Sequence, residues 1–309
     1  MTMIVGYATD ERGGTPLNLA VTLARSSGDD LVVACIVPAP WVPGMARIDA
    51  EYRNALNELA DRALDEAKRD LPEGVPATFV RHVARSAPVG LLELAKLNAA
   101  SLIVLGSSTA GVYGHVALGS VSDRLLHSSP VPLALATRGF RAPPDVTVTR
   151  VTVAYGQSSR TESLVMAAGS VAARLKAALR IASFAVWARP EYPTTLGTDS
   201  EQLVMDEWTS TVQESASAAL RQVEELATAP HDVQIVIGRG RSWAEAIEDV
   251  GWSDSDLLVL GSSELGPAAR VFLGSRATKI MRHSPVPVVV VPRGTAEELA
   301  GRAPRDLTA

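Results

Sequence analysis

The chain has 309 residues, of which 47% are apolar and 20% charged, and its formal net charge is −5. This length predicts two domains, and the apolar content excludes bulk disorder. The mild negative charge argues against nucleic-acid binding, which depends on clustered basic residues.

The single cysteine, Cys35, lies in the apolar run "LVVACIV" and excludes an intramolecular disulfide. We expect it to be a small buried residue in a protein of a reducing compartment. The sequence begins without a signal-peptide pattern and contains no apolar run long enough to span a membrane. These features predict a soluble cytoplasmic protein that binds neither membranes nor nucleic acid.

Strands and helices are predicted to alternate through the first half of the chain. The long helix at 47–70 places Tyr52, Leu56, Leu59, Ala63 and Ala67 at helical spacing, so these are its expected buried face. The uninterrupted apolar run at 31–37 is typical of a parallel strand covered on both sides. The predicted strands are 3–7, 31–37, 78–82, 101–106 and 131–137, and the other helices are 15–26, one capped by Ser86, and 120–127.

The second half repeats this order of elements. Its predicted strands are 151–155, 180–186, 233–237, 256–261 and 286–291, with a long helix at about 199–228. Strand–helix alternation with right-handed crossovers predicts an α/β, Rossmann-like fold with a crevice at the carboxyl ends of the strands. The chain therefore reads as two tandem, doubly wound, five-stranded parallel sheets.

An internal duplication supports this division. Residues 105–139 align with 260–294 without a gap at an offset of 155, and 15 of those 35 positions are identical. We expect domains at 1–140 and 146–294, a linker at 141–145 and a tail at 295–309. The fifth strand of each half is apolar and lies at a sheet edge, so the two are predicted to pair as an intramolecular pseudo-dimer. A further homodimer and unknown protein partners stay open.

A strand–loop–helix junction occurs once in each half and suggests a binding site. In the first half Gly106 ends a strand, and Gly119 and Ser120 begin a helix. The free N–H groups of such a helix start form an anion site, to which Ser120 and Ser122 would add hydroxyl groups. The alternative interpretation is a capped turn with no ligand.

Two stretches carry a family resemblance: "VLGSSTAGVYGHVALGSVSDRLLHSSPVPLALATRG" and "VLGSSELGPAARVFLGSRATKIMRHSPVPVVVVPRG". With the strand–turn–helix starts of both halves, they resemble the universal stress protein family in a tandem arrangement. The resemblance covers about residues 1–294 and implies the doubly wound five-stranded fold. It also implies a role in survival under stress, and many members of the family bind ATP.

The nucleotide motif of that family has the form Gly-x2-Gly-x9-Gly-Ser/Thr. Both halves keep the outer glycines and the serine but lose the middle glycine, which is Thr109 in one half and Glu264 in the other. The family's aspartate after the first strand corresponds to Ala8 and Gly156. The negative charge of Glu264 would repel phosphate unless Arg270 or Arg276 compensates, while Asp10 would replace the aspartate only if its loop shifted.

The first half is therefore the better candidate for ATP binding. Its implied site comprises Ala8, Val37, Gly106, Thr109, Gly119, Ser120, Val121 and Ser122, and the second half contributes Gly261, Gly274 and Ser275.

No catalytic machinery or metal site is predicted. The five histidines lack metal-ligand spacing, and the glycine-rich stretch "GRGRSW" at 238–243 lacks a phosphate-loop pattern and is interpreted as a turn into a helix capped by Ser242. Three functions remain: a non-catalytic stress-response protein that binds ATP, an interaction protein with degenerate sites, and a slow ATP hydrolase.

Overall fold

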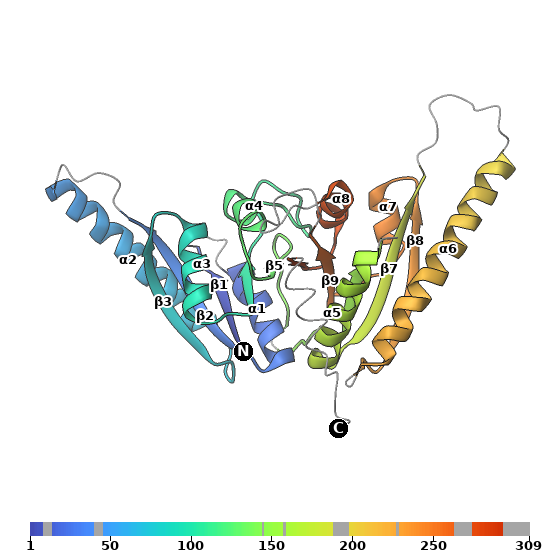
Figure 1. Cartoon of the computed structure of the whole chain (residues 1–309). Coiled ribbons are helices and arrows are strands. Elements are labelled where there is room, and N and C mark those ends of the chain that lie inside the picture. The colour runs from blue at the N-terminus through green and yellow to red at the C-terminus, as the bar shows by residue number, and fades with distance from the viewer. Residues whose placement is uncertain are drawn as a thin grey trace, which may run out of the picture.

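The computed structural model describes residues 1–8, 14–39, 46–143, 145–156, 159–187, 198–226, 229–262 and 274–292 (Figure 1). The predicted tail at 295–309 and the residues Asp10, Glu264 and Arg270 lie outside these ranges. The first half contains β1 (Thr2–Gly6), α1 (Gly14–Ser27), β2 (Asp30–Pro38), α2 (Ala46–Asp70), β3 (Ala77–Ala84), α3 (Ala87–Leu97), β4 (Leu102–Leu105), α4 (Ser120–Leu126) and β5 (Leu133–Leu135).

The second half repeats the order of the first. It contains β6 (Arg150–Ala154), α5 (Ser159–Leu175), β7 (Ala178–Val186), α6 (Thr198–Glu224), β8 (Val233–Gly240), α7 (Trp243–Glu248), β9 (Asp256–Gly261), α8 (Ser275–His283) and β10 (Val288–Val291). The predicted α/β fold with two tandem parallel sheets is confirmed. Among the described residues, no helix is long and apolar enough to cross a bilayer.

The two parallel sheets join into one sheet of ten strands in the order β3-β2-β1-β4-β5-β10-β9-β6-β7-β8. All neighbouring strands are parallel except β5 and β10, which run antiparallel with Ala134 opposite Val289. The predicted pairing of the fifth strands is therefore confirmed. Because both strands are apolar, each covers the edge that the other would leave open. Figure 1 shows the two halves side by side about this seam.

Helices cover both faces of the sheet. One continuous apolar core packs α1, α2, α5 and α6 against one face, and a second core packs α3, α4, α7 and α8 against the other. Successive residues of β2 divide between these cores: Val33 and Cys35 belong to the first, and Val32 and Ala34 to the second. Both faces of the central strands are buried, which explains their uninterrupted apolar sequences.

The predicted buried face of α2 is partly wrong. Tyr52 and Leu59 are 64% and 47% exposed, whereas Ala60 and Leu64 are buried. The first turns of α2, which contain Tyr52, extend past the strands that the helix covers (Figure 1). Leu59 lies beside the contact stripe, because its neighbour Ala60 and the earlier Leu56 face the core. The contact stripe runs through Ala60, Ala63, Leu64 and Ala67, with Leu56 partly buried against the same core.

The glycine-rich stretch after the predicted strand at 233–237 also differs from expectation. Gly238 and Gly240 belong to β8, and only the residues just before Trp243 form the turn. A Cβ atom on Gly238 would lie 2.0 Å from the carbonyl oxygen of Ala246 in α7. These glycines thus permit close packing of helix on strand. The predicted cap is present: the Ser242 hydroxyl accepts a hydrogen bond from the Glu245 N–H group.

A buried ionic network lies inside the second half. Arg180, on β7, is 2% exposed. Its guanidinium donates hydrogen bonds to the Thr152 hydroxyl at 3.0 Å, to the carbonyls of Val250 and Gly251 at 3.2 and 2.7 Å, and to the Asp256 carboxylate at 3.0 Å. This set of acceptors satisfies the buried cation.

Further groups surround this network. Arg150 makes a bidentate contact with Asp256, and the ring of Trp252 lies 4.8 Å from the Arg180 guanidinium carbon. Burial and the neighbouring Arg150 lower the pKa of Arg180 to about 10, which still leaves it charged at neutral pH. By strand register, the first half has Val32 where the second has Arg180, so the network belongs to one half only.

Candidate functional site

A pocket of about 310 Å³ opens at the carboxyl ends of β1, β2 and β4 in the first half. It lies between the starts of α1, α3 and α4, the place where a doubly wound sheet binds ligands. Its lining residues are Gly6, Tyr7, Ala8, Pro16, Ala34, Cys35, Ile36, Ala87, Leu91, Leu105, Gly106, Ser107, Ser108, Gly119, Ser120, Val121 and Ser122.

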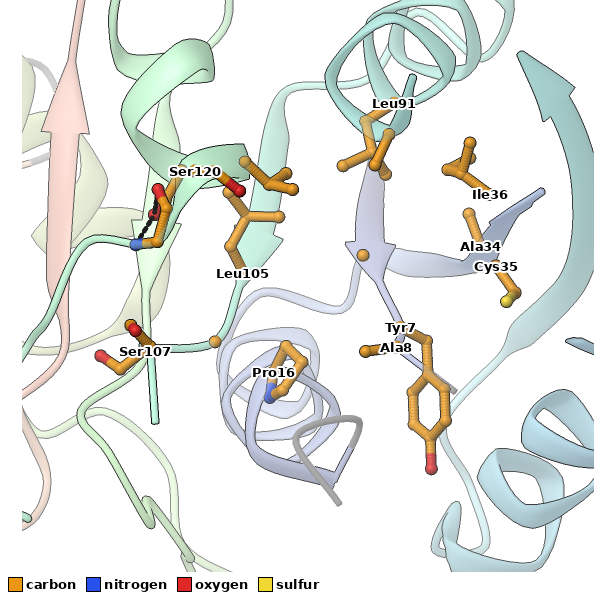
Figure 2. A pocket seen from close by; sticks show the side chains of 17 residues that line it. Tyr7, Ala8, Pro16, Ala34, Cys35, Ile36, Leu91, Leu105, Ser107 and Ser120 are labelled. Atoms are coloured by element: carbon orange, nitrogen blue, oxygen red, sulfur yellow. Dashed lines mark hydrogen bonds between the residues drawn. The ribbon is translucent and has the colours of Figure 1, made fainter. Parts of the chain in front are cut away.

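One end of the pocket is apolar. Figure 2 shows the side chains of Leu91, Ile36, Ala34 and Cys35 together at this end, with Ser107 and Ser120 at the other. Among the lining residues that the structure describes, none is Asp, Glu, Lys, Arg or His. An apolar, uncharged wall of this kind suits a flat ring bound by shape and contact area.

Two lining residues have ionisable groups that stay neutral near pH 7. Burial raises the pKa of Tyr7 to about 12, and the carboxylates of Glu66 and Asp70 act in the same direction. Burial likewise raises the pKa of the Cys35 thiol, with a smaller contribution from Asp61. The predicted burial of Cys35 is confirmed at 2% exposure, and its thiol also lines the pocket.

The other end of the pocket is built by the first turn of α4. Gly119 is its N-cap residue, so the N–H groups of Ser120, Val121 and Ser122 follow without i−4 partners inside the helix. The Ser122 hydroxyl accepts from the Gly119 N–H group at 2.8 Å and donates to the Gly119 carbonyl at 3.0 Å. Ser122 therefore shapes the turn, whereas the Ser120 side chain is exposed at the mouth.

A buried hydroxyl supports the wall next to β4. Ser107 donates to the Ala136 carbonyl at 2.6 Å and accepts from the Ala117 N–H group at 3.0 Å. These two bonds connect the end of β4 with the residue that follows β5 and with the far end of the β4–α4 loop. Ser107 is thus engaged by backbone groups on both sides.

The structure brings together most of the residues assigned to the first-half site. Ala8, Gly106, Gly119, Ser120, Val121 and Ser122 all line the pocket. Thr109 is exposed on the loop and is not part of the lining. Val37 is buried in the core near the end of β2, where Cys35 and Ile36 reach the pocket instead.

Sequence reasoning missed the apolar wall. Tyr7 lies at a strand end, Pro16 and Ala87 lie at helix starts, and Leu91 lies one turn into α3. In the sequence each looks like an ordinary core residue. Their position at the carboxyl ends of the strands was the available signal. The proximity of α1 and α3 across this edge depends on the tertiary structure.

The second half carries the corresponding helix start but differs around it. Gly274 is the N-cap of α8, Ser275 is its first residue, and Gly261 ends β9. The loop at 263–273 lies outside the described residues. A Cβ atom on Gly261 would lie 3.1 Å from Leu164 in α5.

The two halves also differ in the first residue of the helix that follows their third strand, α3 in one half and α7 in the other. Ser86 and Ser242 are the N-caps of α3 and α7, so Ala87 in the first pocket corresponds to Trp243. The ammonium group of Lys279, on α8, lies 5.7 Å from the ring of Trp243. The indole thus stands between α7 and α8, where the first half has a methyl group.

No group of three potential metal ligands occurs among the residues that the structure describes.

Comparisons with known proteins agree with the duplicated fold. The model of the universal stress protein family matches residues 1–136 and again 147–292. A universal stress protein of Mycobacterium tuberculosis (strain H37Rv) is 38% identical over 296 residues, covering 94% of this chain and all of the relative. A relative of the same name from Mycobacterium bovis has the same identity and coverage.

Solved structures show the same architecture. A universal stress protein from Archaeoglobus fulgidus matches with a TM-score of 0.59 and 18% identity, over 95% of this chain and 98% of that one. A putative universal stress protein from Pseudomonas aeruginosa matches with a TM-score of 0.56 and 15% identity, over 97% and 98%. With two family matches spanning nearly the whole sequence, this chain belongs to the universal stress protein family.

Proposed function

We propose that the protein is a non-catalytic, cytoplasmic stress-response protein that binds an adenine nucleotide, ATP, in the pocket of its first half. The observation that carries this proposal is the convergence of Ala8, Gly106, Gly119 and Ser120 on one pocket. Those residues come from three separate segments of the chain. Gly106, Gly119 and Ser120 match the family's nucleotide motif, and Ala8 occupies the position of the family's aspartate.

The two ends of the pocket suit the two ends of a nucleotide. The apolar end offers Ile36 and Leu91 to a planar base. The start of α4 offers N–H groups and the Ser120 hydroxyl to phosphate oxygens. Because no charged side chain lines the described wall, phosphate binding would rest on hydrogen-bond donors and not on ion pairs.

The residues that line the pocket favour binding of ATP without its hydrolysis. The described lining residues include no carboxylate or imidazole to activate a water molecule. The second candidate is an interaction protein whose sites have degenerated. It is favoured by Ala8 at the position of the family's aspartate and by Thr109, which lies outside the pocket lining.

Calorimetric titration of the full chain with ATP, ADP and cyclic AMP separates these candidates. We expect one nucleotide per chain, and native mass spectrometry should show the same stoichiometry. The key variant is Gly119→Val. Gly119 has φ −99°, and a Cβ atom added to it would lie 3.8 Å from Ser108, which also lines the pocket, so valine fits the backbone and adds bulk at the pocket wall.

Gly119→Val should reduce nucleotide affinity at least tenfold while the chain still folds, with a loss of stability of about 1 kcal/mol because valine is a poor N-cap residue. Gly274→Val is the matched control, because it makes the same change at the N-cap of α8 in the other half. Equal affinity in Gly119→Val and the wild type would refute the site. No heat with any of the three nucleotides at millimolar concentration would refute nucleotide binding and favour the interaction protein.

A further inference from the structure

The loop that joins β4 to α4 contributes to the pocket only through its two ends. Gly106, Ser107 and Ser108 at its start and Gly119 at its end line the pocket, whereas the residues between them do not. The position of both ends depends on what holds the body of the loop. At its base, the Ser108 N–H group donates to the Ala117 carbonyl at 2.8 Å and closes the loop.

The body of the loop is held by the segment that follows β5. The Gly114 N–H group donates to the Arg138 carbonyl at 3.0 Å, and the Arg138 N–H group donates to the His115 carbonyl at 2.9 Å. This reciprocal pair of backbone bonds joins two segments more than twenty residues apart. It would not form if Arg138 left its place after β5.

Side chains reinforce the same contact. The Arg138 guanidinium donates to the carbonyl of Gly111, near the tip of the loop. The Tyr113 hydroxyl donates to the Gly139 carbonyl at 3.4 Å, and its ring lies over Gly139, where a Cβ atom would be 2.2 Å from the ring. Gly139 has φ +75°, so both its backbone conformation and its contact with Tyr113 require glycine.

Tyr113 is 71% exposed, so the hydrophobic effect alone does not hold it in place. Val116, farther along the loop, is buried in the apolar core, and the hydrogen bonds to Arg138 and Gly139 hold the exposed part around Tyr113. These hydrogen bonds attach the loop to the segment just after β5, the strand that pairs with β10, where the first half leads into the second.

We propose that Arg138 is a positioning residue of the first-half ligand site. With Gly139 and Tyr113 it forms a latch that holds the β4–α4 loop in the conformation that shapes the pocket. Arg138 itself is absent from the lining and acts through Gly111 and His115. The effect on ligand affinity rests on the proposed nucleotide binding, whereas the effect on the loop does not.

The test compares Arg138→Met with Arg138→Lys and the wild type in the full chain, by amide hydrogen exchange and by ATP calorimetry. Arg138→Met removes the charge-assisted bond to Gly111, and a bond of this strength should change the loop-opening equilibrium about tenfold. We expect the amides of Ser108, Gly114 and Ala117 to exchange about tenfold faster, and ATP affinity to fall by a similar factor. Arg138→Lys should restore part of both effects, since one ammonium donor can still reach the carbonyl.

Arg221→Met is the matched control, because the Arg221 guanidinium also donates to a backbone carbonyl, that of Ser217, but on the distant helix α6. It should leave both the loop amides and ATP affinity unchanged. An unchanged urea midpoint in Arg138→Met would show that its effects do not arise from global unfolding.

The outcomes are distinguishable. Unchanged loop exchange in Arg138→Met would overturn the latch. Faster exchange with unchanged ATP affinity would overturn the positioning role while the latch remained. If the wild type binds none of the tested nucleotides, the proposed function and the positioning role fail together, and hydrogen exchange still decides whether the latch exists.

Discussion

Arg180 and Asp256 form an ion pair in the interior of the second half, with 3.0 Å between Nη2 and Oδ2. Both residues are almost fully buried, at 2% and 3% exposure. A buried charge that loses its partner destabilises a protein far more than the intact pair stabilises it. The stability of the second half therefore depends on keeping both partners of the pair. The first half has Val32 at the position that matches Arg180 and has no such pair there.

We predict that Asp256→Asn lowers the free energy of unfolding by about 3 kcal/mol, because Arg180 remains charged and buried without its carboxylate. Urea unfolding measures this loss. The control is Glu58→Gln, which breaks an exposed ion pair with Arg62 and should cost less than about 1 kcal/mol. Equal effects of the two substitutions would contradict the importance assigned to the buried network.

Ala87→Trp should close the first-half pocket. This substitution introduces the residue that the second half has at the corresponding position, Trp243, which follows the N-cap Ser242 as Ala87 follows the N-cap Ser86. The helix start tolerates tryptophan there, so the fold should persist while calorimetry shows at least a tenfold loss of ATP affinity. Trp243→Ala serves as the control and should leave that affinity unchanged. Tight ATP binding by Ala87→Trp would place the ligand elsewhere.

Cys35 should report on occupation of the pocket. It is the only cysteine of the chain, it lines the pocket, and burial raises the pKa of its thiol. Alkylation by iodoacetamide at pH 7.5 should be at least tenfold slower in the native protein than in urea, because little thiolate is present or accessible. Saturating ATP should slow it further. Acceleration by ATP would contradict a ligand beside the thiol.

Alkaline pH should destabilise the protein through Tyr7. The phenol ionises near pH 10 in an unfolded chain but at about 12 in the native state, where burial disfavours the anion. The native state therefore binds more protons between these values, so its stability is complete below pH 10 and falls as the pH rises towards 12. Tyr7→Phe should flatten this fall in urea unfolding between pH 9.5 and 11. An identical slope in both proteins would rule out this role for Tyr7.

Two helix ends should be improvable with glycine. Ala99 and Lys176 follow α3 and α5 with φ values of 45° and 55°, the left-handed region that side chains disfavour. Ala99→Gly and Lys176→Gly should each stabilise the protein by about 0.5–1 kcal/mol in urea unfolding. Lys96→Gly, in the last turn of α3, is the contrasting control and should destabilise it by about 1 kcal/mol. Destabilisation by both end substitutions would contradict the strain assigned to these positions.

Local pattern determined much of the architecture. Alternating apolar strands and amphipathic helices predicted the α/β fold, and the duplicated stretches at 105–139 and 260–294 predicted the two halves. Pairing of the fifth strands also followed from sequence, because an apolar edge strand needs a partner. These features depend on periodicity and composition, which single segments display.

The sequence could predict only some of the residues that line the pocket. Gly106, Gly119 and Ser120 stand out because a tight turn and a helix start restrict residue choice. Ala87, Leu91 and Cys35 look like any buried residues, and they become a pocket wall only when three segments meet at one edge of the sheet. The same holds for Tyr52 and Leu59, whose exposure depends on how α2 is placed and rotated over the sheet. Sequence alone thus determined the elements and their repetition, whereas long-range packing decided which faces are covered, which side chains form the pocket, and that Arg138 holds its loop.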